Sequence, residues 1–142
     1  TSILDSIPGG DLYIRYPNGD LRNLTAEAGW GISSGELQAG SRAIAVRQPF
    51  VHWGGNKVLF SMLVGGPVAR FDRVYERKWQ IYEAMGVLEG ESVVIAKVEG
   101  QPDYNNISPI YDSHNDIIFI SDAPVDSLTH TYPQLTIAAQ RA

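Results

Sequence analysis

The sequence contains no cysteine among its 142 residues. Without a thiolate, the chain cannot form a disulfide, a cysteine-ligated zinc site, an iron–sulfur cluster or a thioether-linked haem. The chain therefore supplies no redox chemistry through sulfur. Its cellular compartment is left open by this absence.

Positive charge and long apolar runs are also scarce. Eleven basic residues against 16 acidic ones give a net charge of −5, so we expect no basic face for a phosphate backbone and no nucleic-acid partner. The apolar runs are far shorter than the roughly 20 residues that cross a bilayer, and the N-terminus lacks the order of a secretion signal. A single domain with no membrane span is predicted.

Helical periodicity is missing as well. Fourteen glycines and eight prolines are spread over the whole length, and no window keeps an apolar period of 3.6 residues. Short segments rich in β-branched and aromatic residues recur instead, each bounded by turn residues. An all-β fold is therefore predicted, with strands at 11–16, 46 and 50–53, 57–64, 79–83, 93–98, 110–111 and 116–120.

Three of these strand pairs are joined by tight turns. Asn18-Gly19 favours the positive φ angles of a two-residue hairpin, and the segments 54–56 and 113–115 have similar turn composition. The predicted hairpins join 11–16 to 21–25, 51–53 to 58–60, and 110–111 to 117–119.

The hairpins fall into two alternating kinds. When Phe60 is aligned with Phe119, the second and third hairpins match, and each begins near a proline, Pro49 or Pro109. The strand starts at 11–13 and 80–82 also resemble each other. Alternating hairpins in units of four short strands are typical of propeller blades, whose small sheets bury their faces by stacking on neighbouring blades.

Two long segments interrupt this pattern. Residues 26–43 form a glycine-rich connection, and residues 65–78 form an insertion with more basic than acidic side chains. Loops of this length are either binding elements or locally mobile.

The hairpin motifs resemble those of TolB-like β-propeller repeats. Residues 10–13, 18–19 and 24–25 are similar to the outer hairpin of such a repeat, and residues 107–122 to the inner hairpin. A closer resemblance, extending to Leu135, is to the propeller region of secreted bacterial proteins similar to the hydrazine synthase alpha subunit. It is carried by segments 12–19, 51–53, 104–109 and 132–135. This resemblance implies a periplasmic or extracellular compartment.

The resemblance implies one partial propeller domain over residues 1–142. Residues 11–25 would be an outer hairpin, 46–98 a full blade with the inserted loop 65–78, and 104–122 the inner hairpin of the next blade. Propellers of this kind close with about six or seven blades, and this chain holds about two. It is then a fragment, a truncated relative, or a protomer whose open edges pair with another chain.

No catalytic residue, metal site or cofactor is predicted. The histidines His52, His114 and His130 are too far apart in sequence to form a local metal motif, and structural or exposed roles are favoured. The aspartates between 103 and 126 do not reproduce a calcium loop and are better interpreted as turn caps. No serine lies in a nucleophile elbow. The haem chemistry of the resembled enzyme needs cysteine motifs that this chain lacks.

Aromatic residues are expected both in the core and at a binding face. Those in predicted strands should pack between blades: Trp53, Phe60, Trp79, Tyr82 and Phe119. Aromatic residues beside arginines are typical of protein interfaces, and the two long segments contain six candidate interface residues, three aromatic residues and three arginines. These are Trp30, Arg70, Phe71, Arg73, Tyr75 and Arg77, for which packing within the loops is the alternative.

A second candidate binding segment precedes Pro109. Tyr104, Asn105 and Asn106 would lie where the chain enters an inner strand beside a propeller channel, and a capped turn is the alternative. The sequence as a whole therefore predicts a non-catalytic propeller module that binds a protein partner or associates with itself. Two alternatives stay open. One is an accessory subunit or fragment of a multi-haem redox complex that docks on a cytochrome, and the other is a fragment of a propeller hydrolase.

Overall fold

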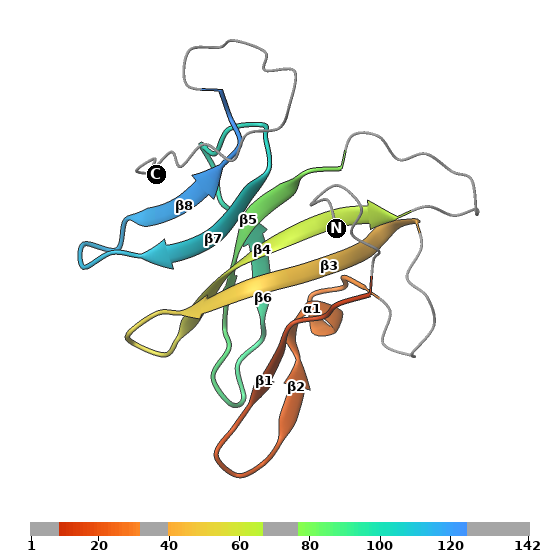
Figure 1. Ribbon diagram of the computed structural model, residues 1–142. Helices are drawn as coiled ribbons and strands as arrows, with labels where there is room; N and C mark the ends of the chain where they lie inside the picture. Colours follow the sequence, from red (N-terminus) through yellow and green to blue (C-terminus); the bar gives the residue numbers. More distant parts are fainter. Residues whose placement is uncertain (1–8, 32–39, 67–76, 125–142) are drawn as a thin grey trace.

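A computed structural model of the chain describes residues 9–31, 40–66 and 77–124. Antiparallel strands make up nearly all of its regular structure, which confirms the all-β class, and they form three sheets (Figure 1). The elements are β1 (Tyr13–Arg15), β2 (Leu21–Asn23), α1 (Leu24–Glu27), β3 (Gly40–Val51), β4 (Lys57–Gly66), β5 (Trp79–Met85), β6 (Val94–Lys97), β7 (Asn106–Tyr111) and β8 (Ile117–Ser121). No helix in the described ranges is long and apolar enough to cross a membrane.

The central sheet contains four strands in the order β3-β4-β5-β6, each antiparallel to its neighbour. Side chains on β4 alternate between its two faces, with Phe60 and Met62 on the first face and Leu59 and Leu63 on the second. All four side chains are buried. The sequence of β4 is therefore a nearly continuous apolar run and does not alternate between apolar and polar residues.

The hairpin of β1 and β2, here called the N-terminal hairpin, packs on the first face. Its flanking residues Leu12 and Leu24 share a buried cluster with Phe60 and Met62, and each such side chain contributes about 1.5–3 kcal/mol when it leaves water. Polar contacts hold the same hairpin: the Arg22 guanidinium donates to the carbonyl oxygens of Leu88, at 3.1 Å, and Glu91, at 2.6 Å. The turn between β5 and β6 thus anchors the N-terminal hairpin.

The hairpin of β7 and β8, here called the C-terminal hairpin, packs on the second face. Tyr111 and Phe119 are buried against Leu59 and Ile81. The Tyr111 hydroxyl donates to Glu83 Oε1 at 2.6 Å, which fixes the hairpin against β5. The molecule therefore has three layers, with the four-stranded sheet between two hairpins (Figure 1).

The two hairpins β3–β4 and β7–β8 share a bulge. Gln48 and Ser108 both have positive φ angles, of 54° and 55°, and each precedes a proline at a shift in strand register. A bulge accommodates proline because the residue there need not donate to the ladder. The two bulges also touch, since the backbone N–H of Ser108 donates to Gln48 Oε1 at 3.0 Å.

All three predicted hairpins form, but several boundaries differ from the prediction. The strand expected over 21–25 ends at Asn23, whose side chain accepts a hydrogen bond from the Ala26 N–H at 2.9 Å and caps α1. β3 begins within the predicted connection 26–43, and β4 continues into the predicted insertion 65–78. Whether the three sheets are propeller blades stays a prediction.

Trp53 is the aromatic residue whose expected burial is wrong. It lies in the turn between β3 and β4 and is 62% exposed, since the chain leaves the ladder after Val51. The other four residues of that set, Phe60, Trp79, Tyr82 and Phe119, are buried as expected.

Candidate functional site

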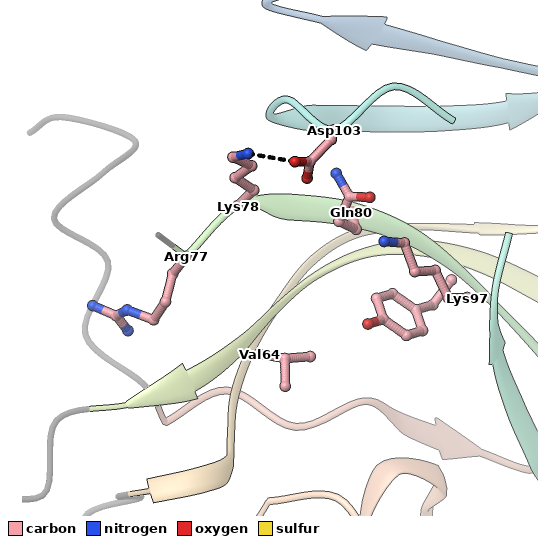
Figure 2. A pocket seen from close by; sticks show the side chains of 7 residues that line it. Val64, Arg77, Lys78, Gln80, Lys97 and Asp103 are labelled. Atoms are coloured by element: carbon pink, nitrogen blue, oxygen red, sulfur yellow. Dashed lines mark hydrogen bonds and ion pairs between the residues drawn. The ribbon is translucent and has the colours of Figure 1, made fainter. Parts of the chain in front are cut away.

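A pocket of about 370 Å³ opens where β5 begins (Figure 2). It is unusual for this acidic chain because three of its lining side chains are cationic and only one is anionic. The lining residues are Val64, Arg77, Lys78, Gln80, Tyr82, Lys97 and Asp103.

Strand geometry brings the inner wall of this pocket together. Gln80 and Tyr82 are two positions apart on β5, so their side chains leave the same face of the sheet. Lys97 on β6 is the direct cross-strand partner of Tyr82. Neighbours of this kind lie side by side on one face, which places the lysine beside the two β5 side chains.

The cationic side chains differ in how they are paired. Lys78 Nζ lies 2.8 Å from Asp103 Oδ2, and this hydrogen bond, with the charges of Lys78 and Lys97, lowers the pKa of Asp103 below its usual value. Arg77 donates to the Gly65 carbonyl oxygen at 3.0 Å. The Lys97 ammonium group forms no hydrogen bond or ion pair with any residue that the structure describes, so its charge is available to a ligand.

Gln80 is buried beside this lysine and is only half satisfied. Its Nε2 donates to the carbonyl oxygen of Tyr104 at 2.6 Å and to that of Trp79 at 3.1 Å. Its Oε1 is buried and has no hydrogen-bond partner within the described ranges. Because a buried acceptor without a donor costs about 1–3 kcal/mol, this oxygen marks a place where a donor from outside would be stabilised.

The first predicted binding surface is placed only in part. Arg77 lines the pocket, and Trp30 packs edge-on against Tyr82, which also lines it, with ring centroids 6.4 Å apart. Trp30 therefore contacts a residue of the pocket without lining the pocket itself. The remaining candidates, Arg70, Phe71, Arg73 and Tyr75, lie outside the described residues.

The second predicted segment follows Asp103 in the chain and lies next to the pocket without lining it. Asn105 accepts a hydrogen bond from the Trp79 N–H at 3.1 Å and donates to Asp122 at 2.8 Å. Asn106 is fully buried, and its Nδ2 donates to the Pro102 carbonyl oxygen at 2.8 Å. These contacts hold the loop that carries Asp103, as a capped turn would.

Of the three residues in this segment, Tyr104 alone exposes a large surface, at 42%. A contact between a partner and the buried Asn106 side chain is not available in this conformation. Among the predicted binding residues that the structure describes, Arg77 is the one that lines the pocket. Gln80, Lys97 and Asp103, which complete the pocket, carry no signal of their own in the sequence because each is an ordinary strand or loop residue.

The histidines lie elsewhere. His52 Nε2 is 2.6 Å from Asn115 Oδ1, at the end of the molecule where the β3–β4 and β7–β8 turns meet, and His114 lies in the latter turn. His130 falls outside the described residues. Across residues 9–31, 40–66 and 77–124, no three histidine or carboxylate side chains gather closely enough to hold a metal ion.

Each hairpin also leaves one face open. On the N-terminal hairpin, Tyr13 and Leu21 are 52% and 65% exposed, on the face opposite the one that Ile14 packs against the core. On the C-terminal hairpin, Ile110 is 42% exposed, while its neighbour Tyr111 points into the core.

Comparison of the chain with models of protein families, with curated proteins and with solved structures finds no match.

Proposed function

We propose that the chain is a non-catalytic binding module that joins further β-sheets into a propeller-type assembly. The observation that carries this proposal is the repeated bulged hairpin. β7–β8 repeats β3–β4 in its fold and in its proline bulge, and the two bulges contact each other. Repetition of one supersecondary unit, stacked face to face, is how repeat architectures bury a continuous core.

The two hairpins behave as complementary halves of a sheet like the central one. β7–β8 repeats its first two strands, and the sequence of β1–β2 resembles its last two. If β8 of one copy paired with β1 of another, the two hairpins together would form a four-stranded sheet in the central order. Each of these edge strands has just one partner strand in the described part of the chain, so its outer N–H and C=O groups are available for pairing.

The open apolar faces support the same arrangement. Tyr13 and Leu21 on one hairpin, and Ile110 on the other, expose large apolar groups that a stacked sheet would cover. A contact between two different hairpins of two copies is head-to-tail, and repetition of such a contact forms a ring when the rotation between copies closes. We therefore propose a second copy of this chain as the partner in the first test.

Sedimentation velocity over a range of concentrations tests this proposal. The unmodified chain should form concentration-dependent oligomers, and Leu21→Ser should shift them to the monomer because the serine removes apolar area from the open face. Leu88→Ser is the matched control: Leu88 is also exposed, at 44%, but lies in the turn between β5 and β6.

Two results would overturn the proposal. One is a folded chain, judged by circular dichroism, that stays monomeric at every concentration. The other is an equal loss of association in Leu21→Ser and Leu88→Ser, which would show that exposed leucines cause non-specific association rather than stacking through the N-terminal hairpin.

A further inference from the structure

We propose that the pocket beside Lys97 binds a carboxylate that lies next to an N–H donor, as an acidic segment of a partner protein presents it. This inference rests on the proposed function only in taking the partner to be a protein. It concerns a different surface from the open hairpin faces, because the pocket is built from β4, β5, β6 and the loop before β7.

Three polar groups on the β5 and β6 side of the pocket are without partners in the described part of the chain. They are the Lys97 ammonium, the Tyr82 hydroxyl and the Gln80 Oε1, and they come from neighbouring positions on β5 and β6. Gln80 is 7% exposed, so its oxygen is almost completely removed from bulk water. Burial also raises the pKa of Tyr82, which keeps its hydroxyl protonated and able to donate at neutral pH.

These groups match one ligand chemistry. A carboxylate accepts hydrogen bonds from an ammonium group and from a phenol, and such charge-assisted bonds are the stronger ones in proteins. Gln80 Oε1 can only accept, so the ligand must also bring a donor. The backbone N–H of an aspartate or glutamate is such a donor close to its own carboxylate. Sulfate, which carries no proton at neutral pH, would satisfy the lysine but not the glutamine oxygen.

The surroundings of the pocket fit an acidic segment in charge and in size. Arg77 and Lys78 stand at the rim, and Figure 2 shows the Arg77 guanidinium directed away from Gln80 and Lys97, so it attracts an anion without filling the pocket. The chain as a whole carries a net charge of −5, which repels acidic partners elsewhere and favours their arrival at this local positive patch. A volume of about 370 Å³ lies at the small end of ligand pockets and suits a short stretch of peptide.

Fluorescence anisotropy with a labelled, acetylated hexaglutamate peptide tests the inference. The unmodified chain should bind this probe, and the binding should weaken as salt is added because the partners are charged. Lys97→Gln should weaken binding by about tenfold, the equivalent of one charge-assisted hydrogen bond. Tyr82→Phe should weaken it by about fivefold on the same grounds. Lys97→Arg should retain most of the affinity.

Matched controls separate the pocket from general attraction of charge. Arg15→Gln removes the same charge from an exposed position on β1, and it should leave the affinity unchanged. A hexaglutamine peptide should bind much more weakly than hexaglutamate, and sulfate should compete poorly. The inference is overturned if hexaglutamate does not bind, if Arg15→Gln weakens binding as much as Lys97→Gln, or if sulfate displaces the probe at equal concentration.

This experiment can fail independently of the proposed assembly. Loss of peptide binding with oligomers intact refutes the pocket alone. Peptide binding by a chain that never associates refutes the assembly and leaves the pocket as a site for an acidic partner.

Discussion

Replacing Gly86 with alanine adds a methyl group where the chain has no room for it. Gly86 has a φ angle of 70°, and a Cβ built on it would lie 2.1 Å from the carbonyl oxygen of Ser92 and 2.9 Å from that residue's carbonyl carbon. The atoms in the way belong to the backbone, so no side-chain rotation relieves the overlap. The turn between β5 and β6 must move instead.

The expected cost has two parts. The left-handed conformation costs a non-glycine residue about 1–2 kcal/mol, and overpacking that displaces backbone adds about 1–3 kcal/mol. Gly90→Ala is the matched control in the same turn, because Gly90 has a similar φ of 81° but nothing within 4 Å of its added Cβ. Both variants pay the conformational cost, so we expect Gly86→Ala to lower the free energy of unfolding by about 1–3 kcal/mol more than Gly90→Ala does.

Urea denaturation followed by circular dichroism measures this difference in the unfolding free energy. Movement of the turn should also loosen the N-terminal hairpin, since Arg22 donates to the Leu88 carbonyl and the Tyr16 hydroxyl donates to the Val87 carbonyl in this turn. Trp30, which packs on the same core, should report this loosening by its fluorescence. Equal destabilisation by the two alanine substitutions would refute the reasoning, because conformation alone would then account for both.

Two further predictions concern the C-terminal hairpin. Ser108→Gly should stabilise the chain by about 0.5–1 kcal/mol in thermal unfolding, because glycine adopts the positive φ of 55° without strain and the backbone N–H that bonds Gln48 is retained; an unchanged or lower melting temperature would contradict this. Burial and the hydrogen bond to Glu83 raise the pKa of Tyr111, so its contribution to stability is complete below the unfolded-state pKa of about 10 and is lost as the pH rises above that value. Tyr111→Phe should therefore be less stable than the unmodified chain at neutral pH, and the gap should narrow in alkaline urea titrations; a constant gap would show that the hydroxyl does not titrate in this way.

Local sequence signals predicted the hairpins because the turns decide them. The Asn18-Gly19 turn and the apolar run of β4 are signals carried by adjacent residues, and both correspond to observed elements. The full lengths of β3 and β7 were missed because Pro49 and Pro109 read as breaks in a strand. In the structure each proline sits at a bulge, and the ladder continues on both sides of it.

The pocket could not be predicted from the sequence because it depends on pairing between strands. Lys97 meets Tyr82 only through the register of β5 with β6. The loop that carries Asp103 is placed by Asn105 and by Gln80, through hydrogen bonds to residues 17 and 24 positions away in the chain. Arg77 was predicted from the composition of its segment, which holds several basic residues, but composition does not show which of them face a pocket.

The hydrogen bond between the two bulges gives the two hairpins different roles. Gln48 supplies the acceptor, and Ser108 at the equivalent place in the next hairpin supplies the backbone donor. The Ser108 side chain is much shorter than that of Gln48 and has no amide group. It therefore cannot accept the equivalent hydrogen bond from a following hairpin. Two hairpins that match in backbone shape are therefore not interchangeable. A chain in which the two hairpins exchanged places in the structure would keep every strand but lose this hydrogen bond. A single amide side chain thus distinguishes the earlier hairpin from the later one.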